Sequence, residues 1–496
     1  MSSWSRSLSL LLVFAVLAAL PAPAAQSGRP PVKEWTFLVF LNADNNLDGC
    51  GVDDQGEMAT VGSNDWLNVV TLIDRVDGPA SLNYIEKGKV TLVREMGEID
   101  MGDWRQLTAF VRDTAAAFPA RHYALVIWNH GSGWSKAHGS LKGISYDDQS
   151  GNHITTAQLG EAMTEIKGIL GRNLDLLCMD ACLMQMFEVA WPVRTCCDFI
   201  VGSEETEPGD GYPYHLLLGR LQKTTTPAEF AAIIVKTYAE FYANEPEDDG
   251  GWGRAPFRRA KKTTQSALRA DRLDAAKDAL DRFAAVAMAG QQAPAIRQAM
   301  SEAQRFYYWS NMDLPHFLRL LAKGTTDPAL AAAAREADAA LAGAIIANGT
   351  TGTNPSDDGG WGDEYDPDRR PRWPGYPIDA CGLAVYFPEK ASGFAQEYFD
   401  LAFARDSRWD ELVQDFYRKN EIPAIVAEVA AGRLDRLQEF AAATSRNNRD
   451  LALRLVAALN FAAFAETPRA PIDQDRFRAL IGQTLANSRR EPATTW

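Results

Sequence analysis

The sequence predicts an α/β fold with a mostly parallel central sheet flanked by helices and a largely helical C-terminal part. In the first 220 residues or so, short continuous apolar runs alternate with amphipathic segments, which is typical of parallel strands covered on both faces. Beyond that point the chain becomes rich in alanine at helical spacing. The 496 residues are 46% hydrophobic and 23% charged, which is the composition of a globular protein able to bury a large core.

The expected strands and helices of the first part follow one another in alternation. Five apolar runs are expected to be buried strands: residues 35–42, 67–74, 123–128, 174–179 and 199–202. Helices are expected between them at residues 104–118, 156–170 and 183–193. Active groups in such sheets gather where the strands end, at their carboxyl ends. Candidate functional side chains are therefore expected directly after these runs.

The second part is expected to be mostly helical. The predicted helices cover residues 227–242, 267–289, 329–347 and much of 422–463. A single apolar stretch, residues 382–387, predicts one further strand.

The first residues have the pattern of a secretory signal rather than of a folded element. Arg6 precedes an apolar run at residues 8–20, and Ala22-Pro23-Ala24 follows as a small-x-small cleavage pattern. A membrane anchor is the alternative, but no later run approaches the roughly 18 apolar residues of a membrane helix. We expect a signal peptide at residues 1–24 and a secreted or periplasmic protein.

Charge and cysteine content narrow the classes of partner. The formal net charge is −15 and becomes −16 when Arg6 leaves with the signal, which disfavours nucleic acid and anionic membranes and suits basic peptides. Six cysteines in so long an exported chain do not make a disulfide framework. One or two bridges stay open, without a pairing.

A histidine follows the third expected strand. Residues 123–128 run into Asn129-His130-Gly131-Ser132-Gly133-Trp134. A histidine at the carboxyl end of a buried strand is well placed to act as a general base. Gly131 has no side chain, so its backbone N–H can approach a substrate carbonyl and stabilise an oxyanion.

A cysteine follows the fourth expected strand. Residues 174–179 run into Asp180-Ala181-Cys182, and a helix is expected to begin just after it. A thiolate close to a helix N-terminus is favoured by the helix dipole, and a neighbouring histidine lowers the thiol pKa further. The 52 residues between His130 and Cys182 suit adjacent parallel strands joined by one crossover helix.

Four segments in this order resemble one family. The segments are Leu41-Asn-Ala-Asp-Asn-Asn-Leu47, the Asn-His-Gly-Ser-Gly-Trp run, Met179-Asp-Ala-Cys182 and Gly202-Ser-Glu-Glu-Thr-Glu-Pro-Gly-Asp-Gly-Tyr-Pro-Tyr214. Together they resemble the clostripain family of cysteine peptidases, which have a caspase-like fold. The resemblance implies a caspase-like catalytic domain at residues 33–220. It also implies a further part of the peptidase at 221–420, where 382–388 resembles a family strand. Residues 421–496 are left as a helical tail of unknown role.

The resemblance also implies roles for single residues. His130 corresponds to the catalytic histidine and Cys182 to the nucleophile, with the N–H groups of Gly131 and Cys182 forming the oxyanion hole. The family cleaves after Arg or Lys, and Asp180 and Asp210 are the acids expected to bind that side chain, since a buried cation needs carboxylate partners. The assignment of Asp210 competes with three nearby acids, Glu204, Glu205 and Glu207.

Self-processing and calcium are two further family properties to consider. Lys142 and Lys136 follow His130 and suit self-cleavage by a peptidase of basic specificity. No cofactor is expected, although Asp44-x-Asn46-x-Asp48-Gly49 resembles the start of a calcium loop. The twelfth loop position is Gln55 instead of Glu, so we favour an Asx-rich turn over a calcium site.

Other functions are weighed against the peptidase. A non-catalytic caspase-like binding protein is the main alternative. A serine hydrolase is the other, because His-Gly-Ser-Gly resembles a lipase oxyanion loop, although no G-x-S-x-G elbow is present. Asp379-Ala380-Cys381 repeats the Asp-Ala-Cys triplet, but an apolar strand follows it, so Cys381 is expected to be a core residue.

Overall fold

A nine-stranded sheet forms the centre of the molecule. The computed structural model describes residues 30–134, 143–244, 263–351, 353–354, 376–377, 379–444, 449–464 and 473–488. The strand order is β12-β10-β9-β8-β5-β1-β2-β3-β4. The strands are β1 (Lys33–Ala43), β2 (Leu67–Arg75), β3 (Ala80–Glu86), β4 (Lys89–Gly97), β5 (Ala120–Trp128), β8 (Leu174–Asp180), β9 (Cys197–Gly202), β10 (Thr263–Arg269) and β12 (Ile345–Thr351).

The middle of the sheet is parallel and its edges are antiparallel. Strands β9, β8, β5, β1 and β2 all pair in parallel, and they are the five strands that the apolar runs predict. Strands β3 and β4 extend one edge, and β10 and β12 extend the other, through antiparallel pairs. The α/β class with a parallel central sheet is therefore confirmed, while the sequence did not predict the four outer strands.

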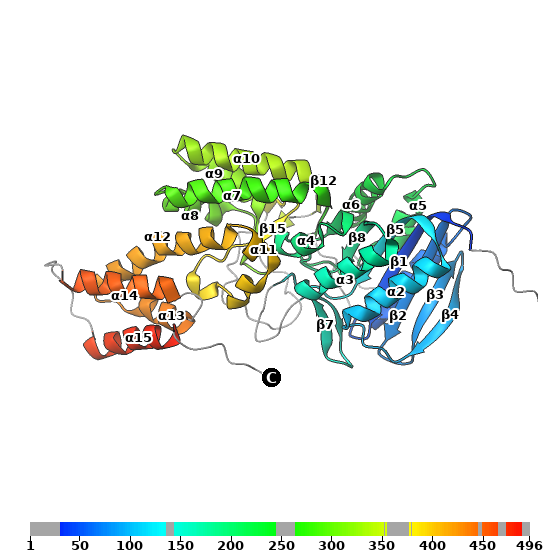
Figure 1. Cartoon of the computed structure of the whole chain (residues 1–496), viewed down its shortest axis with the longest axis horizontal. Coiled ribbons are helices and arrows are strands. Elements are labelled where there is room, and N and C mark those ends of the chain that lie inside the picture. The colour runs from blue at the N-terminus through cyan, green and yellow to red at the C-terminus, as the bar shows by residue number, and fades with distance from the viewer. Residues whose placement is uncertain are drawn as a thin grey trace, which may run out of the picture.

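Helices cover both faces of the sheet, as Figure 1 shows. One face carries α2 (Trp104–Ala117), α3 (Thr156–Leu170) and α4 (Phe187–Val193), and the other carries α1 (Asp48–Val61), α5 (Tyr214–Arg220) and α6 (Pro227–Asn244). Alternate residues of β1 serve the two cores. Leu38 and Phe40 pack on the first face, whereas Phe37, Val39 and Leu41 pack on the second. This two-sided burial explains the unbroken apolar runs.

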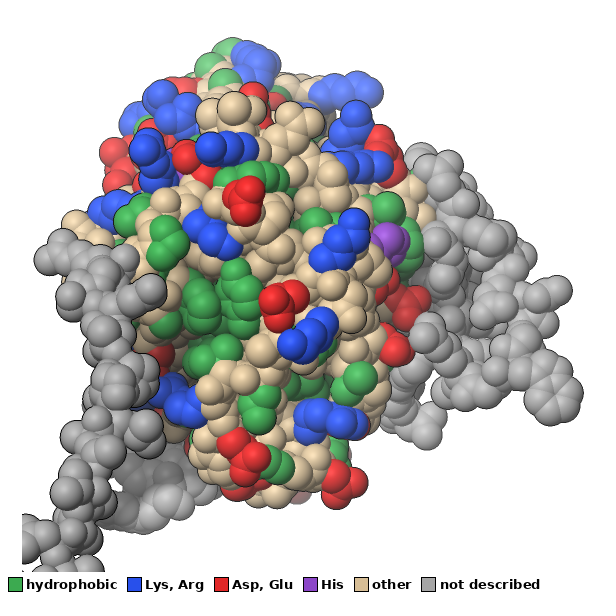
Figure 2. Space-filling model, turned by 90° about the vertical axis from the view of Figure 1, so that its right-hand side faces the viewer, with side chains coloured by type: hydrophobic (Ala, Val, Ile, Leu, Met, Phe, Trp, Pro, Cys, Tyr) green, Lys and Arg blue, Asp and Glu red, His purple; other side chains and the backbone are tan. Residues whose placement is uncertain are grey.

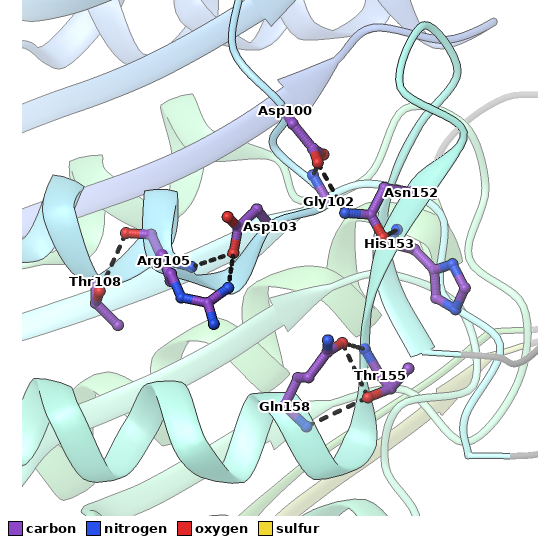
Figure 3. A network of polar contacts seen from close by, with 9 residues as sticks. All are labelled: Asp100, Gly102, Asp103, Arg105, Thr108, Asn152, His153, Thr155 and Gln158. Atoms are coloured by element: carbon purple, nitrogen blue, oxygen red, sulfur yellow. Dashed lines mark hydrogen bonds and ion pairs between the residues drawn. The ribbon is translucent and has the colours of Figure 1, made fainter. Parts of the chain in front are cut away.

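A hairpin of β6 (Gly143–Asp147) and β7 (Asn152–Thr155) leads into α3. The Asn152 side chain donates to Asp100 Oδ2 at 2.8 Å, just before α2 (Figure 3). Thr155 and Gln158 form a capping box that begins α3, which Figure 3 also shows. The hairpin is thus fastened to the helical layer close to the segment that follows β5.

The C-terminal part is largely helical and packs against the sheet domain. Its helices are α7 (Leu273–Ala289), α8 (Ala293–Glu302), α9 (Leu314–Gly324), α10 (Pro328–Ala344), α11 (Ala402–Asp406), α12 (Trp409–Ala430), α13 (Asp435–Ala443), α14 (Arg449–Phe464) and α15 (Gln474–Asn487). Short elements between them are the 3-10 helices η1 (Ala270–Arg272), η2 (Ala391–Gly393) and η3 (Gln396–Asp400), and the strands β11 (Asn311–Asp313), β13 (Thr353–Asn354), β14 (Tyr376–Pro377) and β15 (Ala384–Tyr386). Phe403 stacks on Phe187 of α4 at 4.6 Å between ring centres, which joins the two parts.

Two helix predictions are wrong at their starts. The helix expected at residues 183–193 begins only at Phe187, because residues 183–186 form a turn and an isolated bridge between Met186 and Ala384. The helix expected at residues 267–289 begins at Leu273, because the Ala-rich start of that segment belongs to β10 and η1. In both places tertiary pairing overrides local propensity.

The surface at the β3–β4 edge is mixed in character. Figure 2 shows hydrophobic side chains there between acidic and basic ones. Strand β4 exposes Val90, Leu92 and Val93. The predicted signal at residues 1–24 lies outside the described residues, and none of the described helices is long and apolar enough to cross a membrane.

Candidate active site

Strand register brings His130 and Cys182 to the same edge of the sheet. In the parallel β5–β8 pair, Trp128 lies opposite Asp180. The pairing continues for one more residue, since the Asn129 N–H donates to the Asp180 carbonyl at 3.3 Å. His130 lies two residues after Trp128, and Cys182 lies two residues after Asp180. The 52-residue spacing in the sequence is therefore the register offset of two adjacent strands.

Gly131 packs against the backbone of the cysteine. A Cβ atom at residue 131 would lie 2.4 Å from the carbonyl oxygen of Cys182 and 2.9 Å from Cβ of Ala181. No side chain fits in that space, so the close approach of the two segments requires glycine. The sequence predicted a functional reason for this glycine, and the structure adds a packing reason.

The His130 ring is oriented by a residue from the loop after β1. Its Nε2 lies 2.6 Å from Oδ1 of Asn46. A carboxamide oxygen only accepts hydrogen bonds, so Nε2 carries the proton, and Nδ1 of the neutral ring is the basic nitrogen. Burial lowers the pKa of His130, and the charge of Asp148 opposes this in part. The ring is therefore neutral and able to accept a proton near neutral pH. No feature of the sequence indicated that Asn46 contacts the histidine.

Cys182 lies in a turn that the following chain holds in place. Leu183 has a φ of 64°, a left-handed conformation that is rare for a residue with a side chain. Its N–H donates to the carbonyl of Glu205 at 3.1 Å, and the N–H of Gln185 donates to that of Ser203 at 2.9 Å. Because α4 begins only at Phe187, Cys182 is not at a helix N-terminus, and the expected stabilisation of its thiolate by a helix dipole is wrong.

Cys182 is partly buried, and its thiol accepts a hydrogen bond from one backbone N–H. The N–H of Glu207 donates to its Sγ at 3.2 Å. Burial raises the pKa of Cys182 to about 12; the Glu207 N–H lowers it, and the negative charges of Glu207 and Glu205 raise it. Cys182 is therefore a protonated thiol at neutral pH in this arrangement and needs a base to become a nucleophile.

Asp180 lies at the end of β8 in a pocket of tyrosines. Its Oδ2 accepts a hydrogen bond from the Tyr214 hydroxyl at 2.7 Å and one from the Tyr212 N–H at 3.2 Å. The loop at Gly211 lies so close that a Cβ there would be 2.9 Å from Oδ1. Burial raises the pKa of Asp180 to about 6, while hydrogen bonds from Glu207, Tyr214 and Tyr212 lower it.

Comparison with known proteins agrees with this architecture. The family model described as "Clostripain family" matches residues 39–322, which is more than half of the chain. The chain belongs to the clostripain family.

One curated relative and two solved structures show how far this likeness extends. Clostripain from Hathewaya histolytica is 27% identical over 237 residues, which cover 40% of this chain and 44% of the relative, so the match spans less than half of that protein. A secreted C11 cysteine protease from Bacteroides thetaiotaomicron, solved with an irreversible peptide inhibitor, has a TM-score of 0.57 at 20% identity over 77% of this chain and 99% of its own. An inactive zymogen C11 protease from Parabacteroides distasonis has a TM-score of 0.57 at 19% identity over 76% and 99%. These two structures share the fold.

In this clostripain-family chain, Asp180 and Asp210 both influence two buried groups, Asp54 and Tyr242. After burial, the charges of Asp180 and Asp210 both raise the pKa values of Asp54 and Tyr242. The Tyr242 hydroxyl also donates to the carbonyl of Gly211, next to Asp210, at 2.8 Å. The two aspartates that the sequence predicts for one site thus act electrostatically on the same two side chains.

The three acids that competed with Asp210 point in different directions. Glu204 Oε2 accepts from the N–H of Gly382, and Glu205 Oε1 accepts from that of Tyr307, both at 3.1 Å. Glu207 instead faces Asp180. Of the three, Glu207 is the one beside the candidate specificity acid.

Side chains of the predicted turn at residues 44–49 contact residues in other parts of the chain. Asp48 forms a bidentate ion pair with Arg75 at 2.8 and 2.7 Å. Asp44 accepts two hydrogen bonds from Gln149, and Asn46 contacts His130. Within the described part of the chain, no three His, Cys, Asp or Glu side chains are arranged to hold a metal ion.

Ser132 and Cys381, which the sequence analysis also considered, contact other side chains away from the candidate dyad. The Ser132 hydroxyl lies 2.6 Å from the Tyr146 hydroxyl rather than beside a histidine, so nothing here supports a serine nucleophile. Cys381 is partly exposed and its Sγ accepts from Arg319 at 3.2 Å, so the expectation of a core residue is wrong. All six cysteines are free in this structure, so it contains none of the disulfide bridges that the sequence left open.

Proposed function

We propose that this chain is a secreted cysteine endopeptidase that hydrolyses peptide bonds after Arg or Lys. The observation that carries the proposal is the register of β5 and β8, which places His130 and Cys182 at one sheet edge with Gly131 against the Cys182 carbonyl. Membership of the clostripain family supports the same activity.

The chemistry follows from the two side chains. Nδ1 of His130 takes the thiol proton as Sγ of Cys182 attacks the scissile carbonyl carbon. The N–H groups of Gly131 and Cys182 donate to the oxyanion that forms. His130 then gives the proton to the leaving amine, which departs as the C–N bond breaks. Water, deprotonated by His130, hydrolyses the thioester and restores the thiol.

The substrate's basic side chain is assigned to the region of Asp180 and Asp210. A guanidinium or ammonium group that leaves water must be paired with carboxylates, and a buried pair gains more from the interaction than an exposed one. Asp180 lies two residues before the nucleophile, so a side chain placed at its carboxylate belongs to the residue whose carbonyl Cys182 attacks.

Secretion and self-processing complete the proposal. The signal pattern at residues 1–24 supports export. Self-cleavage after Lys142, or after Lys136, would leave two chains; both lysines lie outside the described residues. An active enzyme whose intact mass corresponds to one uncut mature chain would contradict self-processing.

A matched set of fluorogenic peptides tests the activity. The peptides differ only at the residue before the scissile bond, which is Arg, Lys, Asp or Leu, and are assayed with wild type and Cys182→Ala. We expect turnover of the Arg and Lys peptides alone, abolished in the variant. Equal turnover of the Leu peptide would contradict the basic specificity, and activity of Cys182→Ala would contradict the nucleophile.

A further inference from the structure

Two buried carboxyl groups face each other beside the candidate nucleophile. Oε1 of Glu207 accepts a hydrogen bond from the Gln265 side chain at 3.1 Å. Its Oε2 is buried, and no donor N–H or O–H of the described residues reaches it. The group that it faces is the carboxyl of Asp180, which already accepts from Tyr212 and Tyr214. Two carboxylates in such contact repel each other unless one holds a proton.

The surroundings of this pair favour the shared proton. Burial raises the pKa of Glu207 well above its ordinary range, and the charge of Asp180 raises it further, while Gln265 lowers it. Among the described residues, the titratable groups found to interact with Asp180 or Glu207 are acids, phenols and thiols. They come from α1, β8, the turn after β8, the loop before α5, α5 and α6: Asp54, Glu57, Cys178, Cys182, Tyr212, Tyr214, Tyr238 and Tyr242.

We propose that Glu207 is a specificity-determining residue: it shares one proton with Asp180 while the site is empty, and the pair releases that proton when a guanidinium, amidinium or ammonium group binds. This inference rests on the proposed cleavage after Arg or Lys and adds a third acid to that site. For each cation that binds, one proton leaves for the solvent. The hydrogen bond between Glu207 and Asp180 is then lost, and both carboxylates pair with the cation instead. A neutral side chain cannot compensate the two charges and leaves the proton in place.

The position of Glu207 also links this site to the nucleophile. Its carboxyl belongs to the acid pair, whereas its N–H caps Sγ of Cys182. A cation that draws the Glu207 side chain toward itself therefore acts on the residue that holds the thiol.

Calorimetry with benzamidine, a soluble amidinium probe, tests the proton release. The mature full-length protein is titrated at about pH 6 in two buffers of different ionisation enthalpy, and the difference in heat gives the protons released. We expect close to one proton for wild type and none for Glu207→Gln. The matched control is Glu204→Gln. Glu204 is also a buried acid, but it pairs with Asp313 and not with Asp180. This variant should release the proton as wild type does.

A second measurement needs no variant. If one proton leaves on binding, the affinity of wild type for benzamidine rises about tenfold per pH unit below the pKa of the pair and then levels off. A flat profile, or proton release unchanged in Glu207→Gln, would overturn the inference. So would absence of benzamidine binding in a protein that cleaves Arg and Lys peptides. A protein that neither binds benzamidine nor cleaves basic peptides would refute the proposed function itself.

Discussion

The backbone N–H of Glu207 donates a hydrogen bond to Sγ of Cys182 at 3.2 Å. Even with this donor, burial raises the pKa of the Cys182 thiol to about 12. The resting nucleophile is thus a protonated thiol, and the histidine at the same sheet edge is neutral, so the two do not form an ion pair at rest.

Alkylation of Cys182 by iodoacetamide should therefore be slow at neutral pH. Because the thiolate is the reactive form, the rate should rise about tenfold per pH unit from about pH 7 to pH 9 without levelling off. The rate is measured by peptide mass spectrometry, with the partly exposed Cys50 followed in the same samples. Rapid labelling of Cys182 that does not change over this range would indicate a thiolate of low pKa and contradict this account.

Asn46 should control the pH dependence of catalysis through His130. Asn46→Ala removes the acceptor that fixes the ring, and we expect kcat/KM to fall about 10- to 100-fold. Asn46→Asp places a carboxylate at Nε2, which raises the histidine pKa; since the base must be unprotonated, the acidic limb of the pH profile should move to higher pH. The readout is kcat/KM for an Arg peptide against pH.

Asn173→Asp is the control for this series, because Asn173 lies just before β8, at the opposite end of that strand, and contacts Asp198. Its pH profile should match wild type. An Asn46→Asp profile that also matches wild type would show that Asn46 does not position the histidine.

Gly131→Ala should disturb the site without unfolding the protein. The new methyl group would meet the carbonyl oxygen of Cys182 at 2.4 Å, so one of the two segments must shift. A displacement of about 1 Å near reacting groups costs roughly 100-fold in rate. Gly168→Ala, in open space on α3, is the control and should retain activity. Full activity of Gly131→Ala would mean that the two strand ends lie farther apart than described.

Asp180→Asn should weaken selection of the basic residue. Loss of one partner of a buried charge pair costs about 2–5 kcal/mol, so kcat/KM for Arg and Lys peptides should fall at least about 30-fold. Turnover of a Leu peptide should not fall in parallel. Asp278→Asn, on the exposed side of α7, should change neither rate. A uniform loss for all peptides would assign Asp180 a structural role only.

The sequence predicted the parallel centre of the sheet well because its signal is local. Strands β1, β2, β5, β8 and β9 are buried on both faces and appear as continuous apolar runs. Strand β10 could not be recognised, since its alanine resembles the start of the helix that follows, and its pairing partners β9 and β12 are distant in sequence. Long-range pairing of this kind leaves no local pattern.

The candidate site was predicted only where a motif marked it. His130, Gly131 and Cys182 follow strands and belong to recognisable segments. Asn46 and Glu207 also lie in such segments, but their roles could not be predicted, because these roles depend on contacts across 84 and 25 residues with His130 and Cys182. The helix after Cys182 was predicted to begin too early for the same reason. Residues 183–186 pair with the chain near Ser203 and with β15 instead of forming the first turn of α4.

Cys182 is expected to react with a substrate that is positioned by its basic residue. Two peptidyl chloromethyl ketones, identical except for Arg or the uncharged norleucine at the residue bearing the reactive group, are incubated with the mature protein, and adducts are located by peptide mass spectrometry. We expect a single adduct, on Cys182, with the Arg reagent, and at most slow reaction with the norleucine reagent. The other five cysteines serve as internal controls. Modification of another cysteine, or equal rates with both reagents, would contradict this expectation.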